Sequence, residues 1–353
     1  MLRELNNDEY GGLYFDKEQN LHIWVVDEKA IEEKISKINS NNDSANQLPI
    51  MTYEEATYSI NELGKIISRL LSEDKTGTIQ YAGIDESKNS LVIYTTDISN
   101  KNTMTISTVC EVENIHFIYC SKTEQTKTTN YNIMPNKLSA TKSTVNVYGG
   151  MGIIYDGLAT MTCSAVYPYS AGSNGWDVGF MSVAHEFQTG YNCWSRWYLN
   201  YLGQCTAHWD VNNGHPSCDI AFIDNNYNSH GWINDNSGNS TQITSRARPI
   251  AGATTYYMYG AKSAIRKPCQ IIATNIQGLS GGCAGNIKMF SYSYEPQPGD
   301  SGGPIVRINS NGTATIVGYN TNAFTVGMTN SNEHGLGMDI KEVEYNCAMV
   351  PCT

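Results

Sequence analysis

The sequence lacks the marks of a membrane protein and of a nucleic-acid-binding protein. No apolar run approaches the roughly 18 residues that a transmembrane helix requires, and lysine and arginine form no basic stripe. Charged residues make up only 16% of the 353 residues, and the formal net charge is −11. We therefore expect no membrane span, and no nucleic acid among the partners.

The sequence also lacks a metal-binding cysteine pattern. Its 10 cysteines include no CxxC pair, and no cysteine–histidine cluster has zinc-finger spacing, so we expect no metal and no cofactor. An even number of cysteines in a chain rich in tyrosine and asparagine indicates disulfides and an oxidising compartment. We predict that neighbours along the sequence pair: Cys110–Cys120, Cys163–Cys193, Cys205–Cys218, Cys269–Cys283 and Cys347–Cys352.

An apolar signal segment is absent from the start of the chain. Residues 1–7 are polar, and no apolar segment of roughly 7–15 residues follows them, as a secretory signal requires. Either the natural N-terminus lies upstream, or the signal has been removed, or export takes another route. We nevertheless expect a secreted, extracellular protein, because disulfides persist in oxidising compartments.

The composition that is present favours β-structure and two regions of different character. Gly, Asn, Ser, Thr and Tyr are plentiful, which favours turns and half-buried strands over long helices. Residues 1–140 hold 21 acidic and 13 basic residues, whereas residues 141–353 hold 13 and 10. Residues 121–143 are rich in Lys, Thr, Ser and Asn and indicate a linker where cleavage would occur. We predict two domains, 1–140 and 141–353.

The first domain has the pattern of a small α+β unit. Residues 10–16, 21–27, 79–85 and 90–94 predict short strands, and residues 28–38 predict a helix. A second helix is predicted to open at Glu54 and Glu55. Its apolar residues recur with helical period: Ile60, Leu63, Ile66, Ile67 and Leu70. From Val145 onward, short strands between Gly, Asn and Ser turns predict an all-β barrel or sandwich.

One hexapeptide suits a catalytic nucleophile. Residues 299–304 are GDSGGP and precede the β-branched pair Ile305–Val306, so Ser301 would lie on a tight turn that leads into a strand. The glycines permit backbone angles that side chains forbid. The N–H groups of Gly299 and Ser301 can then point at one spot and form an oxyanion hole. This stretch resembles the active-site loop of chymotrypsin-like serine proteases.

A base for this serine is predicted at His185. The apolar strand 178–184 runs through small residues into this histidine, which would place the imidazole where the strand leaves the core. The stretch resembles the GF-x-[ST]-A-[GA]-H signature of the same family, with Val183 where alanine is usual and Glu186 where a half-cystine is common. His208 also follows an alanine, but it lacks the preceding apolar strand.

The carboxylate that orients the base is predicted at Asp219. This residue precedes the apolar run 220–223, a position where an acid is costly to bury without a partner. It resembles the D-[IL]-A-[LVI] segment of the family, and Asp224 and Asp210 are the alternatives. The chain order, histidine then aspartate then serine, is that of chymotrypsin-like proteases and differs from the orders of subtilisins and α/β-hydrolases.

The resemblance implies a fold and an activity. It implies an all-β catalytic domain of two six-stranded antiparallel Greek-key β-barrels packed together. An α+β prosegment of the alpha-lytic and streptogrisin type would precede it, with the likeness lying in Tyr53 to Asp97. Such prosegments act as folding templates and inhibitors. The implied protein is a secreted, trypsin-like serine endopeptidase, made as a zymogen and inhibited by its own prosegment, that hydrolyses polypeptide substrates through an acyl-enzyme.

Two alternatives remain open. The first is a catalytically silent binding protein on the same protease fold, which the departures at Val183 and Glu186 favour. The second is an N-terminal domain that stays in place as a recognition module.

The resemblance also implies a substrate pocket. Glu295 stands six residues before the nucleophile, at the base of the pocket in this family, where a carboxylate would favour arginine or lysine substrates. Alternatively, Glu295 is a solvated surface charge. Thr321 and Asn322 would form the opposite wall.

Asp300, inside the hexapeptide, also needs a partner. In the bacterial members of the family an internal cation holds this aspartate. Lys262 and Arg266 are the nearest upstream cations, so the resemblance implies one of them as the partner.

Overall fold

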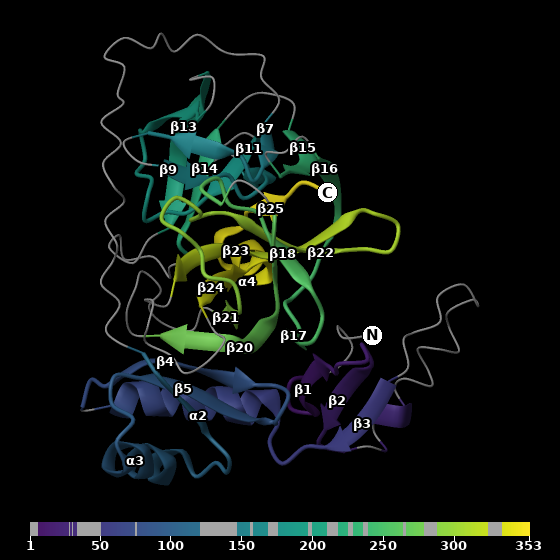
Figure 1. Cartoon of the computed structure of the whole chain (residues 1–353), viewed down its shortest axis with the longest axis vertical. Coiled ribbons are helices and arrows are strands. Elements are labelled where there is room, and N and C mark those ends of the chain that lie inside the picture. The colour runs from purple at the N-terminus through teal and green to yellow at the C-terminus, as the bar shows by residue number, and fades with distance from the viewer. Residues whose placement is uncertain are drawn as a thin grey trace.

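The computed structural model shows three tiers of secondary structure (Figure 1). The N-terminal part forms the bottom tier, and the C-terminal part forms the two tiers above it. No helix in the described ranges has both the length and the apolar character needed to cross a bilayer. The structure describes residues 6–27, 29, 31–33, 51–74, 76–120, 147–155, 158–168, 176–196, 200–209, 218–224, 229–235, 239–263, 266–278, 288–323 and 334–353.

The N-terminal part mixes helices and strands, as its sequence pattern predicted. Its elements are β1 (Tyr10–Phe15), β2 (Leu21–Val25), β3 (Met51–Glu55), α2 (Ile60–Glu73), β4 (Ile79–Asp85), β5 (Ser90–Thr95), α3 (Asn100–Cys110) and β6 (His116–Tyr119).

The C-terminal part consists mainly of strands. Its elements are β7 (Val147–Gly149), β8 (Gly152–Ile154), β9 (Leu158–Thr160), β10 (Ser164–Pro168), β11 (Trp176–Ser182), β12 (Asn192–Ser195), β13 (Tyr201–Trp209), β14 (Ile220–Asp224), β15 (Ser229–Asn234), β16 (Ser240–Arg246), β17 (Ala251–Gly252), β18 (Tyr256–Met258), β19 (Lys267–Cys269), β20 (Ile271–Gly278), β21 (Met289–Tyr292), β22 (Pro304–Ile308), β23 (Ala314–Ala323), β24 (Gly335–Asp339), α4 (Ile340–Cys347) and β25 (Val350–Pro351).

Two curled, mainly antiparallel sheets form this C-terminal part. The first has the strand order β25-β10-β11-β14-β13-β12-β8-β9, and the second contains the run β19-β18-β22-β23-β24-β21-β20. This is the chymotrypsin-like double β-barrel fold, so the predicted fold class is confirmed. The sheets extend beyond the predicted barrels, because β25 joins the first and β4, β5 and β6 of the N-terminal part continue the second.

Helix α2 begins at a capping box, and its predicted start is wrong. Ser59 Oγ accepts a hydrogen bond from the Glu62 N–H at 3.1 Å, and Glu62 Oε2 accepts one from the Ser59 N–H at 2.8 Å. Glu54 and Glu55, predicted to open the helix, lie in β3 and pair in parallel with β2. Sheet pairing therefore outweighs local helix propensity here. The helical period itself is confirmed, with four residues of the pattern buried: Ile60, Leu63, Ile67 and Leu70.

Helices α3 and α4 were not predicted, because their buried stripes are only partly apolar. The stripe of α3 includes Asn102 among its buried residues, and that of α4 includes Glu342. A polar residue within the stripe weakens the periodic hydrophobic signal on which the prediction depends.

Strand β5 is buried on both faces, which ties the N-terminal part to the barrels. Side chains alternate along a strand, so Leu91 and Ile93 pack with the helices α2 and α3. Val92 and Tyr94 face the other way and belong to the cluster that includes barrel residues. The Tyr94 hydroxyl lies 3.1 Å from Ser291 Oγ of β21, inside this buried contact.

Strand pairing continues across the same junction. Strand β4 pairs antiparallel with β20, where Ile84 lies opposite Thr274 and Ala82 lies opposite Gln277. Strand β1 pairs in parallel with β17, where Tyr14 lies opposite Ala251. Figure 1 shows both contacts where the bottom tier meets the middle tier. The N-terminal part is therefore joined to the second barrel by backbone hydrogen bonds at two places.

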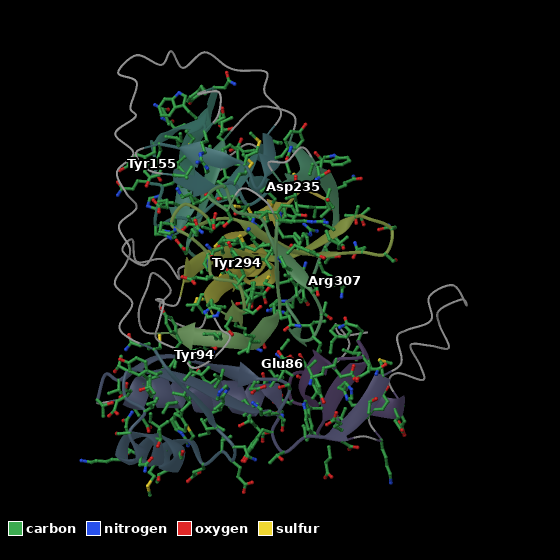
Figure 2. All side chains as sticks on the ribbon, viewed as in Figure 1. Glu86, Tyr94, Tyr155, Asp235, Tyr294 and Arg307 are labelled. Carbon is green, nitrogen blue, oxygen red and sulfur yellow. The ribbon has the colours of Figure 1, made fainter. Side chains whose placement is uncertain are left out.

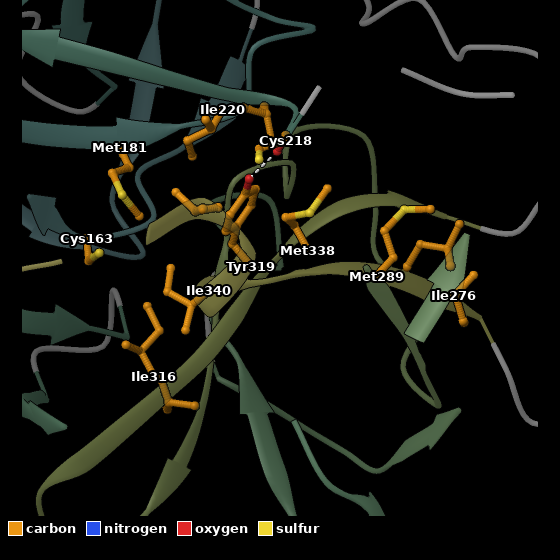
Figure 3. Close-up of a cluster of buried hydrophobic side chains, with 14 of the residues drawn as sticks. Cys163, Met181, Cys218, Ile220, Ile276, Met289, Ile316, Tyr319, Met338 and Ile340 are labelled. Atoms are coloured by element: carbon orange, nitrogen blue, oxygen red, sulfur yellow. Dashed lines mark hydrogen bonds between the residues drawn. The ribbon is translucent and has the colours of Figure 1, made fainter. Parts of the chain in front are cut away.

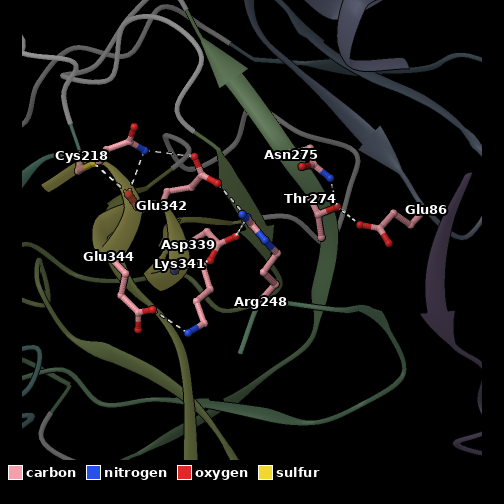
Figure 4. A network of polar contacts seen from close by, with 10 residues as sticks. Glu86, Cys218, Arg248, Thr274, Asn275, Asp339, Lys341, Glu342 and Glu344 are labelled. Carbon is pink, nitrogen blue, oxygen red and sulfur yellow. Dashed lines mark hydrogen bonds and ion pairs between the residues drawn. The ribbon is translucent and has the colours of Figure 1, made fainter. Parts of the chain in front are cut away.

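A buried carboxyl group, Glu86, lies at this junction (Figures 2 and 4). It belongs to the turn between β4 and β5 and is only 6% exposed. Its Oε2 accepts a hydrogen bond from the Leu13 N–H at 2.8 Å, and its Oε1 accepts one from the Thr274 hydroxyl. Burial raises the pKa of Glu86 to about 7, the charge of Asp85 adds to this, and the two hydrogen bonds and Lys288 oppose it.

The largest buried cluster fills the space between the two barrels (Figure 3). Met181 and Ile220 enter it from the first barrel, and Ile316 and Tyr319 enter it from β23 of the second. The Tyr319 hydroxyl donates to the Cys218 carbonyl oxygen at 2.5 Å. This contact fixes the residue that precedes Asp219 against β23.

The cysteines do not form the predicted pairs. Six of them are unpaired thiols, at least one from each predicted pair: Cys110, Cys163, Cys193, Cys205, Cys269 and Cys347. The five predicted disulfides are therefore wrong, although Cys283 lies outside the described residues. The error has a geometric reason, because strand pairing rather than distance along the sequence decides which cysteines become neighbours. Burial raises the pKa of Cys193, and the nearby Cys205 raises it further. Burial likewise raises the pKa of Cys163, to which the nearby Cys352 adds.

Candidate active site

The predicted nucleophile lies on a tight loop between β21 and β22. Gly299 and Gly302 adopt φ values of 101° and 88°, in the region that favours glycine. A Cβ on Gly302 would lie 2.2 Å from the Thr160 carbonyl oxygen and 2.8 Å from Ser182 Oγ. The glycines are therefore required both by the backbone angles and by the close approach of the first barrel to the loop.

The backbone N–H groups of the loop fall into two sets. Those of Asp300, Gly302 and Gly303 donate to carbonyl oxygens within the protein, each at 2.8 Å. Those of Gly299 and Ser301 have no acceptor among the described residues. Two N–H groups, separated by one residue, are thus left for an acceptor from outside, as the predicted oxyanion hole requires.

Asp300 is completely buried and is held by neutral donors. Its Oδ1 accepts from the N–H groups of Lys262 and Ser263, both at 2.9 Å, and its Oδ2 accepts from the Gln297 N–H at 3.0 Å. The Ser263 hydroxyl adds a bond of 2.5 Å to the same Oδ2. Four hydrogen bonds offset the cost of burying this carboxylate.

The predicted cation for Asp300 is therefore wrong. Lys262 contributes its backbone N–H rather than its ammonium group, and the guanidinium of Arg266 lies over the ring of Tyr257, 4.9 Å from the ring centre. Backbone donors replace a cation because residues 262 and 263 turn their N–H groups toward the aspartate.

His185 and Asp219 meet as the sequence predicted. His185 Nδ1 lies 2.8 Å from Asp219 Oδ2 and 3.0 Å from Oδ1, and the His185 N–H donates to Oδ1 at 2.8 Å. The Asp219 side chain is 3% exposed and that of His185 is 30% exposed. The Thr321 hydroxyl also donates to Asp219 Oδ2. The imidazole therefore rests on a buried, fixed carboxylate while part of its ring reaches solvent.

Strand β23 links the aspartate to the serine loop. Asn320 exchanges two backbone hydrogen bonds with the loop, from the Gly302 N–H and to the Gly303 carbonyl oxygen, each of 2.8 Å. The next residue, Thr321, contacts Asp219. From the first barrel, the Thr160 N–H donates to the Ser301 carbonyl oxygen at 2.8 Å. Neighbouring residues of β23 thus connect the loop of Ser301 to Asp219, the partner of His185.

The sequence did not predict the contact between His185 and Glu186. Glu186 Oε1 lies 3.7 Å from His185 Nε2, and Glu186 Oε2 accepts a hydrogen bond from the Tyr155 hydroxyl at 2.5 Å. Figure 2 labels Tyr155 in the first barrel. The departure from the family signature at position 186 was the only sign of this contact in the sequence.

The alternative candidates lie elsewhere or outside the described residues. His208 Nδ1 lies 2.8 Å from Thr189 Oγ1, in an exposed contact. Asp224 ends β14, five residues after Asp219, and Asp210 lies outside the described residues. Among the described residues, no group of three or more His, Cys, Asp or Glu side chains is arranged to hold a metal ion.

The predicted pocket residues are placed in different surroundings. Glu295 is exposed on the segment between β21 and the serine loop. Thr321 is 4% exposed and uses its hydroxyl on Asp219. Asn322 lies in β23, but its side chain is outside the described set. The pocket therefore stays a prediction.

Comparison with known proteins gives similarity at the level of solved structures only. No protein-family model and no curated protein matches the chain. Similar structures include Nocardiopsis protease and Cellulomonas bogoriensis chymotrypsin, each with 17% identity, a TM-score of 0.44 and coverage of 59% of this chain and 100% of the other. Thermobifida fusca protease A has 16% identity and a TM-score of 0.43, with the same coverage.

Proposed function

We propose that this protein is a serine endopeptidase in which Ser301 is the nucleophile, His185 the base and Asp219 the residue that orients the base. The observation that carries the proposal is the contact between His185 Nδ1 and both oxygens of Asp219, at 2.8 and 3.0 Å. A carboxylate on Nδ1 keeps the proton of a neutral imidazole on that nitrogen, so Nε2 is left as the acceptor that a serine hydroxyl requires.

The reaction would follow from this arrangement. Ser301 Oγ attacks the carbonyl carbon of a peptide bond and transfers its proton to His185 Nε2. The carbonyl oxygen becomes negatively charged and accepts hydrogen bonds from the N–H groups of Gly299 and Ser301, which have no acceptor among the described residues. The imidazolium then gives its proton to the leaving amine, which departs and leaves Ser301 acylated. In the second half, His185 takes a proton from a water molecule that attacks the acyl group, and returns it to Ser301 Oγ.

We also propose that residues 1–140 are a prosegment that inhibits the enzyme until the chain is cut within 121–143, and that the protein is secreted. The support for the prosegment is the junction itself, where β4 pairs with β20 and β1 pairs with β17. An N-terminal part that continues the sheet of the second barrel can guide the folding of that barrel. The alternative of a permanent recognition module predicts an active protein of full length.

We further propose a preference for substrates that carry an arginine or lysine side chain. Glu295 is exposed, where a carboxylate could attract an arginine or lysine side chain of a substrate. An extended peptide could add to β23 as a further strand, with backbone hydrogen bonds supplying affinity and Asn322 contributing to the wall.

Labelling with a fluorophosphonate tests the catalytic proposal. The folded protein, the Ser301→Ala variant and the Ser310→Ala variant, whose serine is exposed in a turn, would be treated in parallel, and their masses determined. We expect label on the natural sequence and on Ser310→Ala, but none on Ser301→Ala, because only an activated serine reacts.

The same experiment separates the alternatives. Label on a species that has lost about 140 residues would support both the nucleophile and the zymogen. Label on the full-length chain would support the recognition module in place of the zymogen. No label on trimmed, folded protein would overturn the enzyme and favour the silent binding protein.

A further inference from the structure

Glu186 is a second carboxylate on the proposed base. It directly follows His185 in the turn after β11, and its side chain is only 5% exposed. Its Oε1 lies 3.7 Å from His185 Nε2, while Asp219 occupies the Nδ1 side of the same ring at 2.8 Å. The imidazole therefore lies between two carboxylates from different parts of the chain.

Tyr155 fixes the orientation of Glu186. Its hydroxyl donates to Glu186 Oε2 at 2.5 Å, a short distance typical of hydrogen bonds to a charged acceptor. The ring of Tyr155 lies 4.6 Å from that of Phe187 and 5.5 Å from that of Tyr191, measured between centroids. With one oxygen on Tyr155, the other oxygen of Glu186 is directed at the imidazole.

We propose that Glu186 is a positioning residue for His185, which contacts the Nε2 side of the ring and favours its charged form. The proposal rests on the proposed function, since it concerns the residue assigned there as the base. Of the described residues, two carboxylates contact the imidazole. These are Asp219, which precedes β14, and Glu186, with Tyr155, which follows β8, hydrogen-bonded to Glu186.

This position has two opposite consequences for the reaction. A carboxylate near Nε2 stabilises a proton there. His185 therefore loses that proton, and can accept one from Ser301, only at higher pH. The same carboxylate stabilises the imidazolium that forms when Ser301 attacks, which supports turnover once the base is neutral. We therefore expect Glu186 to lower the activity at low pH, where His185 stays protonated, and to raise it at high pH, where His185 is neutral.

The test compares Glu186→Gln with the natural sequence. The titration of His185 would be followed by NMR of histidine-labelled full-length protein in the Ser301→Ala background, where no turnover interferes. We expect Glu186→Gln to lower the midpoint of His185 by about one pH unit, as removal of one charge at this distance does. Glu186→Asp, which keeps the charge but withdraws it, is expected to cause a smaller shift in the same direction.

The other histidines supply an internal control. His22 lies 2.6 Å from Glu54 and 3.1 Å from Asp16, in the N-terminal part, so its midpoint is expected to stay unchanged in both variants. An unchanged His185 midpoint in Glu186→Gln would overturn the inference. If Glu186→Gln does not fold, an unchanged His185 midpoint in Glu186→Asp would overturn the inference instead.

Activity provides a separate measurement. With Ser301 intact, the acidic limb of the kcat/KM profile is expected to move to lower pH by the same amount in Glu186→Gln, while kcat at high pH falls several-fold. A shifted midpoint without any turnover in the natural sequence would contradict the proposed function and leave the positioning role standing. Turnover with an unshifted acidic limb would contradict the positioning role alone.

Discussion

The loop that carries Ser301 and the junction with the N-terminal part each bury a carboxyl group, and different donors offset the cost of burial at the two places. Asp300 receives four hydrogen bonds, three from backbone N–H groups and one from a hydroxyl. Glu86 receives one backbone N–H and one hydroxyl, beside the charge of Asp85, and burial raises its pKa to about 7. Four donors hold the carboxylate of the loop, whereas burial favours a proton on the carboxyl group of the junction.

This difference matches the different tasks that we propose for the two regions. A loop that must hold a nucleophile and two free N–H groups benefits from rigid support. A junction that must form during folding and later release benefits from a contact that conditions can weaken. Four substitutions, taken from the largest expected effect to the smallest, test whether the two regions differ in this way.

The largest effect is expected at the site, from Asp219→Asn. Asparagine tolerates the φ of 45° that Asp219 adopts, so the fold and the junction should be preserved. The amide can donate a hydrogen bond to His185 Nδ1, which would leave the imidazole proton on Nε2. Nε2 could then not accept the proton of Ser301, and kcat toward a peptide substrate should fall roughly 10⁴-fold. The control is Asp224→Asn at the other end of β14, and equal losses in the two variants would remove Asp219 from its assigned role.

The second effect is a pH dependence of stability from Glu86. Its pKa is raised by burial from 4.5 to about 7, so the folded protein keeps a proton that the unfolded chain releases. This stabilisation is complete below pH 4.5 and is lost as the pH rises through 7, by roughly 3 kcal/mol in all.

Urea unfolding between pH 4 and 8.5 measures this dependence in the natural sequence and in Glu86→Gln. Burial raises the pKa of Asp339 to about 6, so this residue also lowers the free energy of unfolding as the pH rises. Asp339 is present in both proteins, and the difference between their pH profiles therefore gives the contribution of Glu86. Parallel pH profiles for the two proteins would show that the junction does not depend on this proton.

The third effect tests the rigid support of the loop through Ser263→Ala. This change removes the hydroxyl that lies 2.5 Å from Asp300 Oδ2 and leaves a buried acceptor less satisfied, at a cost of about 1–3 kcal/mol in the free energy of unfolding. Ser310→Ala, at an exposed turn, is the control in the same urea titration. A Ser263→Ala protein as stable as this control would show that the backbone donors suffice.

The smallest effect is expected at the junction, from Tyr94→Phe. The change removes the hydroxyl 3.1 Å from Ser291 Oγ and keeps the ring, so the free energy of unfolding should fall by about 1 kcal/mol. Tyr345→Phe is the matched control, because Tyr345 is 87% exposed. If Tyr94→Phe lowers the free energy of unfolding by more than Ser263→Ala does, the proposal that the loop is held more firmly than the junction is wrong.

The sequence predicted those parts of the site that local patterns encode. The GDSGGP stretch requires glycine at the turn, and the apolar runs beside His185 and Asp219 mark where strands end, so each residue could be placed by its neighbours. The apolar period of α2 is local in the same sense. Short-range geometry determines all of these features, and the sequence displays it directly.

Long-range contacts between backbone and side chain could not be predicted. Nothing in the sequence shows that residues 262 and 263 turn their N–H groups to Asp300, because any residue can supply a backbone donor. The neighbours of Cys193 depend on the register of β12 with β13, which shifts at an irregularity next to that residue. The contact of Tyr155 with Glu186 spans 31 positions and has no spacing signature.

The pairing of β20 with β4 has a further consequence for association. Without the N-terminal part, the side of β20 that now faces β4 would become the open edge of a sheet, with a row of backbone donors and acceptors lacking partners. Such edges invite strands from other molecules, which leads to aggregation or to templated assembly. While it is in place, the N-terminal part covers this edge of β20, so that a strand of another copy of the chain cannot pair with it there.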